Sequence, residues 1–234
     1  MVALKEDGRT RRDFIKGSVA LGAAAALGLA CAQASRLDGL LKFVGATKTG
    51  EERKRWGMVI DLSKCVGCHR CVKACREENG LPEGVEWCRV HKVGVKDGKV
   101  YWLPSLCMHC ADPPCLSVCP TGATYKREDG IVMVDRSRCI GCESCVWACP
   151  YGARRMDPAS GFATKCTFCF QRVDKGLKPA CVEACPMHAR IFGDLNDPTS
   201  EVCKALEAAG EKVFVLHPEM ATDPSVRYIK PGGS

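Results

Sequence analysis

Residues 107–150 read CMHCADPPCLSVCPTGATYKREDGIVMVDRSRCIGCESCVWACP and contain two blocks of four cysteines, each followed directly by proline. Three thiolates at short spacing let one loop bind three corners of an iron–sulfur cubane. The fourth cysteine follows on a helical turn, points away from that loop and can bind a second cubane. Pro120 and Pro150 then turn the chain back. The spacing predicts two [4Fe–4S] clusters bound crosswise by block two (Cys107, Cys110, Cys115, Cys119) and block three (Cys139, Cys142, Cys145, Cys149).

Two further blocks flank this stretch. Block one reads CVGCHRCVKAC (Cys65, Cys68, Cys71, Cys75), and block four reads CTFCFQRVDKGLKPACVEACP (Cys166, Cys169, Cys181, Cys185). Sixteen of the nineteen cysteines therefore lie in four groups of four, enough for four [4Fe–4S] clusters. The arrangement of blocks two and three resembles that of two-cluster bacterial ferredoxins.

The order of the blocks predicts a nested α+β fold with short strands, short helices and many loops. Residues 107–149 would form a central ferredoxin-like unit with two clusters. Residues 56–106 and 150–196 would form a second, split unit around it, and residues 197–234 would add a C-terminal helix and a covering segment.

Crossing of the fourth cysteines predicts the ligands of each cluster. Cluster 1 takes Cys65, Cys68, Cys71 and Cys185, and cluster 2 takes Cys75, Cys166, Cys169 and Cys181. Cluster 3 takes Cys107, Cys110, Cys115 and Cys149, and cluster 4 takes Cys119, Cys139, Cys142 and Cys145.

Other cysteine chemistries fit the spacing less well. Zinc ribbons use separated C-x2-C pairs, whereas four cysteines within eleven residues suit a cubane. Neighbouring cysteines at such spacings cannot all form disulfides without strain. Residues 65–69 match the haem c pattern C-x-x-C-H, but a haem there would leave Cys71 and Cys75 without a role.

The remaining residues offer no acid–base site typical of a hydrolase or transferase. Cys88 and Cys203 are expected to be small buried side chains, and Trp87, Trp102 and Trp147 core residues. His69 and His109 are expected at the surface or beside a cluster. Arg172 is interpreted either as a stabiliser of a reduced cluster or as a solvated surface residue.

Residues 1–34 are predicted to be a twin-arginine signal peptide. Arg11 and Arg12 precede an apolar run of 14 residues, 17–30, which is too short to cross a bilayer comfortably. Cleavage is expected after Ala34, and lipidation of Cys31 is the alternative. Export of the folded protein to the periplasm would allow the clusters to form first in the reducing cytoplasm, where thiols persist.

The formal charge of +7 falls to +5 without this leader. Each bound cluster would add roughly two negative charges, so a basic nucleic-acid-binding surface is not predicted.

Local patterns predict a few short elements between the blocks. Residues 35–55 are expected to be a linker, and 56–60 and 131–134 to be strands. Residues 86–93 and 99–103 are expected to form a hairpin with its turn at 96–98. A helix is predicted from Asp197 to about Ala209, and edge strands are predicted at 213–216 and 227–229. Because little apolar sequence separates the blocks, the iron-free chain is expected to be largely unfolded.

These features together resemble the four-cluster iron–sulfur subunits of complex iron–sulfur molybdoenzymes, such as polysulfide, tetrathionate and dimethyl sulfoxide reductases, and the iron–sulfur component of formate-dependent nitrite reduction. The resemblance rests on the four blocks, the C-x2-C-x11-C-x3-C-P spacing of block four and the Gly193-Asp194-Leu195 segment before Asp197-Pro198. Block one departs modestly, because Arg76 replaces the usual proline. No ligand position carries tryptophan, so all four clusters are expected to be [4Fe–4S].

The resemblance implies an electron-transfer subunit without a substrate-converting site of its own. Cluster 1 would lie next to a catalytic molybdopterin subunit, and cluster 4 would lie towards a membrane quinone-binding subunit that anchors the complex. The alternatives are a subunit of a molybdenum-free quinone-linked complex with a cytochrome or thiol-disulfide partner, and a free periplasmic ferredoxin.

Overall fold

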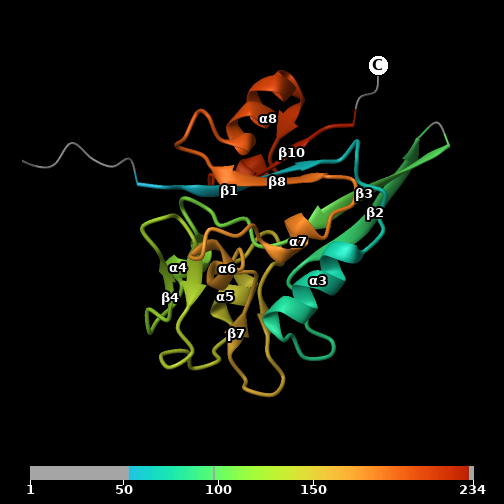
Figure 1. Ribbon diagram of the computed structural model, residues 1–234. Helices are drawn as coiled ribbons and strands as arrows, with labels where there is room; N and C mark the ends of the chain where they lie inside the picture. Colours follow the sequence, from blue (N-terminus) through green and yellow to red (C-terminus); the bar gives the residue numbers. More distant parts are fainter. Residues whose placement is uncertain (1–52, 97, 232–234) are drawn as a thin grey trace, which may run out of the picture. The chain divides into compact units, whose positions relative to one another are not determined.

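The structure is a computed structural model that describes residues 53–96 and 98–231 (Figure 1). The predicted leader and most of the predicted linker lie outside the described residues, as does Asp97 in the predicted hairpin turn. None of the helices in the described part of the chain combines the length and the apolar character needed to cross a bilayer.

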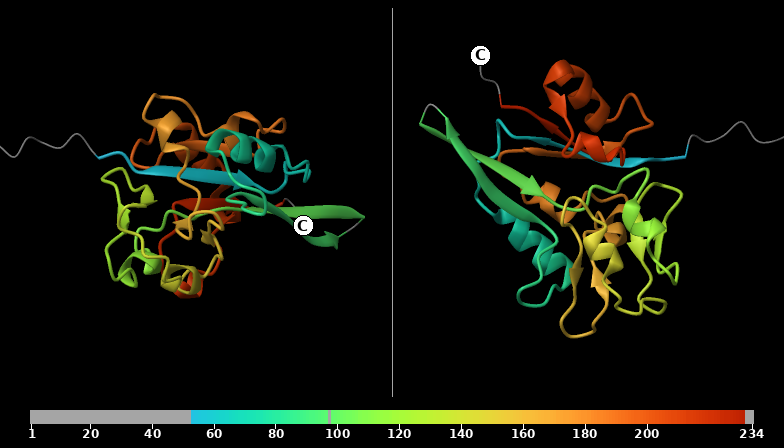
Figure 2. Two further views of the ribbon diagram at one scale, coloured as in Figure 1. Left: turned by 90° about the horizontal axis from the view of Figure 1, so that it is seen from below. Right: turned by 180° about the vertical axis from the view of Figure 1, so that it is seen from behind.

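A four-stranded sheet of order β8-β1-β10-β9 joins both ends of the described chain. Strand β1 (Trp56–Asp61) pairs antiparallel with β8 (Arg190–Asp194) and parallel with β10 (Val226–Ile229), which pairs antiparallel with β9 (Val213–Phe214). Figures 1 and 2 show α8 (Glu201–Ala209) on one face of this sheet and the cysteine-bearing segments on the other. Cover on both faces explains why Met58, Val59 and Ile60 are all buried, since a strand enclosed in this way has no polar side.

Two C-terminal expectations need correction. Strand β10 is not an edge strand, because it lies between β1 and β9 and buries Val226 and Tyr228 completely. Helix α8 begins at Glu201, after the N-cap Ser200, rather than at Asp197. Asp197 instead forms a local turn, in which its side chain accepts hydrogen bonds from Thr199. The predicted end at Gly210 is confirmed.

Three two-stranded sheets accompany the cysteine blocks. Strands β4 (Thr124–Lys126) and β5 (Val132–Val134) connect blocks two and three. The predicted hairpin is present as β2 (Arg89–Lys96) and β3 (Lys99–Ser105), and it begins three residues later than expected. Strands β6 (Arg155–Met156) and β7 (Ala163–Thr164) form a shorter hairpin between blocks three and four.

The helices of the blocks are short. They are α3 (Arg70–Asn79), α4 (Pro114–Ser117), α5 (Ser144–Trp147), α6 (Phe170–Val173) and α7 (Ala180–Glu183), and two 3-10 turns follow α8 at Gly210–Lys212 and Pro218–Met220. A main core joins the sheet to the blocks, with Phe168 packed against both Phe192 of β8 and His109 of block two. The fold therefore mixes α and β elements, as predicted for ferredoxin-like [4Fe–4S] domains.

Candidate iron–sulfur centres

All four blocks share one local architecture. The third cysteine of each block is the second residue of a short helix: Cys71 in α3, Cys115 in α4, Cys145 in α5 and Cys181 in α7. The residue before each second cysteine has a left-handed backbone, with φ of 69° at Gly67, 43° at His109, 69° at Gly141 and 53° at Phe168. A left-handed residue turns successive backbone N–H groups towards one side, which forms a concave site for anions.

The blocks differ in how their helices begin. In blocks one and three the N-cap residue is left-handed, with φ of 58° at His69 and 60° at Glu143. In blocks two and four the N-cap is a proline, Pro113 or Pro179. The strand pairs follow the same alternation: β4 after block two pairs with β5 before block three, and β8 after block four pairs with β1 before block one.

The cysteines predicted to bind cluster 1 line one cavity. Cys65, Cys68 and Cys71 come from block one and Cys185 from block four, although residues 76–165 separate the two blocks. The space that no protein atom fills is about 370 Å³, part of it open to solvent. Burial, together with the charges of Cys71 and Cys185, raises the pKa of Cys65.

The cysteines predicted to bind cluster 4 line a second cavity. Cys119 comes from block two, and Cys139, Cys142 and Cys145 come from block three. The unfilled space is about 340 Å³ and is also partly open. Burial raises the pKa of Cys119, but hydrogen bonds from Thr124 and Thr121 outweigh it and lower the pKa to about 7. These donors favour the thiolate, the form that binds iron.

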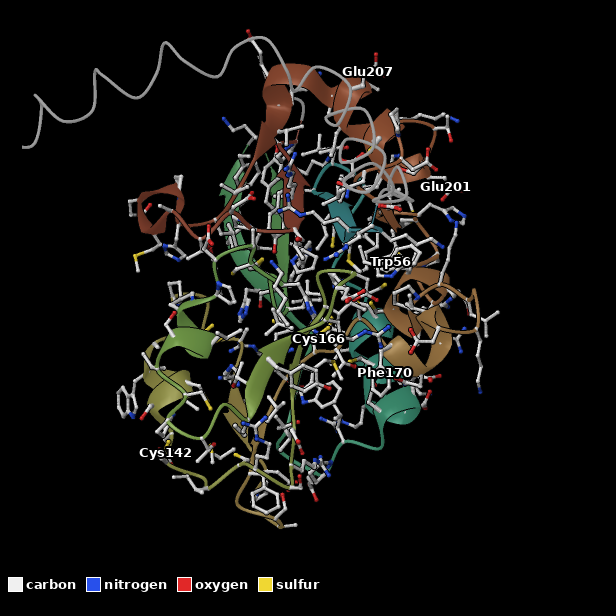
Figure 3. The ribbon with its side chains drawn as sticks, turned by 90° about the vertical axis from the view of Figure 1, so that its left-hand side faces the viewer. Trp56, Cys142, Cys166, Phe170, Glu201 and Glu207 are labelled. Atoms are coloured by element: carbon white, nitrogen blue, oxygen red, sulfur yellow. The ribbon has the colours of Figure 1, made fainter. Side chains whose placement is uncertain are left out.

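The cysteines predicted to bind cluster 2 lie in the interior. Cys75, Cys166, Cys169 and Cys181 are all buried. Burial, followed by the charges of Cys181 and Cys169, raises the pKa of Cys75 to about 12. Figure 3 shows Cys166 deep among the other side chains and Cys142, from the cluster 4 group, at the periphery.

The cluster 3 cysteines are nearly as enclosed. Cys107, Cys110 and Cys115 are buried, and Cys149 is half-buried. Burial and the charges of the other three thiols raise the pKa of Cys110 to about 12, against a hydrogen bond from Thr222 that lowers it.

This donor set fits [4Fe–4S] clusters. Each group brings together four thiols that form no disulfide among the described residues. Burial, joined in most cases by mutual repulsion, raises the pKa values of eight of these sixteen thiols, and bound iron would supply the opposing positive charge. No three His, Cys, Asp or Glu side chains of residues 53–96 and 98–231 converge on a single ion position. A cubane does not require that, because its four thiolates bind four separate irons.

Three buried cations lie against the cysteine groups, and sequence reasoning missed them. Arg190 is 4% exposed, and its guanidinium donates to Cys71 (Nη2–Sγ 3.6 Å) and Cys181 (Nη1–Sγ 3.8 Å). It also donates to Cys88 over 3.1 Å. Burial lowers the pKa of Arg190, but the three thiols outweigh it and raise the pKa well above its usual value.

Arg154 and Lys165 are the other two cations. Arg154 is 1% exposed and donates from Nη2 to Cys115 over 3.1 Å. Burial raises the pKa of Cys145, and the nearby charge of Arg154 opposes that rise. Lys165 is 2% exposed, and its ammonium donates to the carbonyl oxygens of Val132 and Cys166. Burial lowers the pKa of Lys165, and the charge of Arg154 adds to this; the charges of Cys107 and Cys166 act in the opposite direction without reversing it.

One local signal could have identified the arginines. Each stands five residues after the fourth cysteine of a block, in Cys149-Pro-Tyr-Gly-Ala-Arg154 and Cys185-Pro-Met-His-Ala-Arg190. Lys165 directly precedes the first cysteine of block four.

The burial of several other side chains matches what the sequence predicts at some positions and differs from it at others. Trp147 is 84% exposed, so its assignment to the core is wrong, whereas the burial of Cys88 is confirmed. Cys203 is only half-buried in α8. Arg172 is half-buried and forms ion pairs with Glu78 and Glu183, and its charge also opposes the rise in the pKa of Cys169, so both interpretations retain support.

His69 and His109 differ in their exposure to solvent. His69 is exposed, and His109 is completely buried beside Cys110. Burial, followed by the charges of Lys165 and Arg154, lowers the pKa of His109 well below its usual value. Its Nδ1 accepts a hydrogen bond from the backbone of Val132, so the neutral ring carries its proton on Nε2.

Comparison with known proteins identifies the family of these sites. Residues 64–123 and 98–195 each match a 4Fe-4S dicluster domain, and residues 10–28 match a twin-arginine translocation pathway signal sequence. Two dicluster domains correspond to four [4Fe–4S] clusters, as predicted. The signal sequence supports export to the periplasm.

Relatives match over most of the chain. A tetrathionate reductase subunit of Salmonella typhimurium is 46% identical over 77% of this chain and 74% of its own length. A sulfite dehydrogenase subunit of Allochromatium vinosum is 43% identical over 74% of this chain and 81% of its own. An Hdr-like menaquinol oxidoreductase iron-sulfur subunit of Archaeoglobus fulgidus is 37% identical over 96% of this chain and 99% of its own. The chain therefore belongs to the family of iron–sulfur electron-transfer subunits of respiratory oxidoreductases, with two 4Fe-4S dicluster domains.

Proposed function

We propose that the mature chain relays electrons between a catalytic molybdopterin subunit and a membrane quinone-binding subunit, at the periplasmic face of the membrane, in anaerobic respiration. One structural observation carries this proposal: two of the four cysteine groups have a member exposed at the surface, whereas the other two groups are almost entirely buried. Cys68 of the cluster 1 group and Cys142 of the cluster 4 group are exposed, whereas all cysteines of the cluster 2 group are buried. This arrangement suits a conductor that receives electrons at one end and releases them at the other.

The ligand assignment forms part of the proposal. The two surface cavities and the buried contacts support the crossed assignment, with cluster 1 held by blocks one and four and cluster 4 by blocks two and three. The strand pairs β4–β5 and β1–β8 support a central unit at 107–149 nested within a split unit at 56–106 and 150–196. Residues 197–234 would cover the sheet of the split unit.

Apolar side chains surround both exposed ends. Val66 and Met187 are exposed at the rim of the cluster 1 cavity. Ile140 is exposed at the cluster 4 cavity, and Trp147 lies nearby in α5. Exposed apolar groups of this kind mark protein–protein contacts. The cluster 1 end would face the molybdopterin subunit, and the cluster 4 end the quinone-binding subunit.

A molybdenum-free complex is the second candidate. Its support is the Hdr-like menaquinol oxidoreductase iron-sulfur subunit, which matches this chain nearly from end to end. In that complex the same four clusters would pass electrons between a quinone-reactive membrane subunit and a cytochrome or a thiol-disulfide partner.

Anaerobic pull-down from gently solubilised membranes separates these candidates. We expect a molybdenum-containing subunit and a membrane subunit to copurify with the tagged full chain, as measured by metal analysis and mass spectrometry. Haem-containing or thiol-disulfide partners without molybdenum would favour the second candidate. Recovery of the chain alone would point to a diffusing ferredoxin and overturn the proposal.

The crossed ligands can be tested separately. Cys65→Ser and Cys185→Ser should remove or convert the same EPR signal, because both cysteines would bind cluster 1. Cys203→Ser, which changes a cysteine outside the four blocks, is the matched control and should leave all signals intact. If Cys185→Ser instead changes the same signal as Cys166→Ser, the crossing is wrong.

A further inference from the structure

The three buried cations follow the order of the proposed clusters. Arg190 contacts Cys71 of cluster 1 and Cys181 of cluster 2. The ammonium of Lys165 donates to the carbonyl oxygen of Cys166, a ligand of cluster 2. The charge of Cys107, a ligand of cluster 3, also acts on this ammonium. Arg154 donates a hydrogen bond to Cys115 of cluster 3, and its charge acts on Cys145 of cluster 4. One cation therefore stands at each of the three junctions in a row of four clusters.

No carboxylate explains this burial. Among the described residues, none of the three cations forms a salt bridge with Asp or Glu. An unpaired buried charge is strongly unfavourable, so an anion must compensate each of them. The neighbouring cysteine thiolates, and the anionic clusters that they would bind, are the available anions.

Unsatisfied donors point to the same conclusion. Nε and Nη1 of Arg154 are buried without a hydrogen-bond partner in the described structure, and so is Nε2 of His109. Buried donors normally have partners. The sulfurs of bound clusters would supply acceptors for these atoms, because Arg154 donates to Cys115 and His109 directly precedes Cys110 in the chain.

We propose that Arg190, Lys165 and Arg154 are fixed positive charges that raise the reduction potentials of the two clusters on either side of each. The proposal rests on the ligand assignment given above. One-electron reduction adds a negative charge to a cluster, and a buried cation stabilises that charge because little water screens it. The charges of Arg190 and Arg154 stay in place in both redox states, because a guanidinium remains protonated, so their stabilisation requires no proton uptake.

Potentiometric titration of the anaerobically purified full chain, followed by EPR, tests the proposal. Arg190→Gln should lower two of the four midpoint potentials, and Arg154→Gln should lower the other two. Lys165→Met should lower one potential from each set. We expect each affected ratio of reduced to oxidised cluster to fall about tenfold at a given potential, which corresponds to 59 mV for a one-electron couple.

Matched variants separate charge from packing. Arg190→Lys and Arg154→Lys keep the positive charge and should restore most of the shift. Arg227→Gln removes a charge from β10 of the same sheet, where the side chain is only partly buried, and should leave all four potentials unchanged. Iron content near sixteen per chain shows that a variant retains its four clusters.

Each outcome bears on one proposal. Unchanged potentials with full iron content would overturn the role of the cations while leaving the four-cluster conductor intact. Shifts of the same two clusters by Arg190→Gln and Arg154→Gln would also overturn it. If the unaltered chain binds far fewer than sixteen irons, the proposed function itself fails. If an Arg→Gln variant does not retain its clusters, the matching Arg→Lys variant is measured in its place. This variant keeps the positive charge, so a tenfold fall in the ratio of reduced to oxidised cluster in it would contradict the proposal.

Discussion

The strand pairs β4–β5 and β1–β8 occupy equivalent places beside their cysteine blocks, but they differ in size. Only residues 127–131 separate β4 from β5, and the pair has three residues in register on each strand. Residues 62–189 separate β1 from β8, which pair through five residues and continue into β10 and β9. Helix α8 covers the larger sheet (Figure 1).

Loop closure gives a physical reason for this difference. The entropic cost of joining two segments rises by about 0.6 kcal/mol for each doubling of the loop. The loop between β1 and β8 is nearly five doublings longer than the β4–β5 turn, a difference of about 3 kcal/mol. The apolar residues buried by β1, β10 and α8 offset that cost. Close sequence neighbours can pair with short strands, whereas distant segments need a larger core.

Iron removal should produce the largest difference in stability between the two regions. In the iron-free chain we expect residues 107–149 to unfold, because strands of three residues and helices of four are too short to persist alone. Residual protection should be confined to β1, β8 and β10, where the apolar core lies. Hydrogen exchange measured by mass spectrometry before and after anaerobic chelation tests this. Protection retained throughout 107–149 would contradict it, and reconstitution with iron and sulfide is the control.

Truncation of Tyr228 should weaken the larger sheet. The side chain is fully buried, and its hydroxyl donates to the carbonyl oxygen of Pro104 over 3.0 Å. Tyr228→Ala should lower stability by about 3–5 kcal/mol, and Tyr228→Phe by about 1 kcal/mol, because Phe keeps the ring and loses one hydrogen bond. Val132→Ala in β5 should lower it by about 2 kcal/mol. Denaturant midpoints of the cluster-loaded chain measure these effects, and equal losses for Tyr228→Ala and Tyr228→Phe would contradict the packing argument.

Substitution of two glycines, one in block one and one in block three, allows the cysteine loops of the split unit and the central unit to be compared. Gly67 and Gly141 both have φ of 69°, where another residue is strained by about 1–3 kcal/mol. A Cβ at Gly141 would lie 2.6 Å from the backbone oxygen of Gly161, whereas a Cβ at Gly67 would meet the side chain of Trp102. Both alanine variants should lower iron content.

A second substitution distinguishes the two loops. Trp102→Ala should restore part of the iron content of Gly67→Ala, because it removes the clash and leaves only the backbone strain. No side-chain substitution can remove the backbone obstacle at Gly141. Iron per chain is the measurement, with Trp102→Ala alone as the control. A Gly67→Ala variant that Trp102→Ala does not rescue would contradict this account.

The smallest expected effect concerns an ion pair between the two regions. Arg127, after β4, donates to both carboxylate oxygens of Asp174, after α6, over 3.0 and 2.6 Å. The hydrogen bond from Arg127 lowers the pKa of Asp174. Its contribution is therefore fully present above the ordinary aspartate pKa of about 3.9 and is lost as pH falls through the lowered folded value.

A double-mutant cycle measures this pair. Because the carboxylate is largely exposed, we expect a coupling of only about 0.2–1 kcal/mol between Arg127→Gln and Asp174→Asn, decreasing with added salt. Coupling that persists below pH 3 would argue against the ion pair as its source.

Local chemistry made some features predictable. Strand β1 and the end of α8 at Gly210 followed from nearby residues, as did the number of clusters. The central position of β10 could not be predicted, because its neighbour β1 lies more than 160 residues away in sequence. The prediction that Trp147 lies in the core was wrong for a related reason. A tryptophan is usually buried, but the position of Trp147 at the end of α5 leaves its side chain at the surface.

By itself, the sequence determined the chemistry of this protein. Spacings of two to four residues in blocks one to three place thiolates within one loop or helical turn, so the cofactor can be predicted from short-range pattern alone. Tertiary structure alone decided which cysteines reach the surface and which arginines and lysine lie against them. Those properties depend on segments that meet only when β8 pairs with β1, and burial turns ordinary basic residues into charges that act on their neighbours because water is excluded.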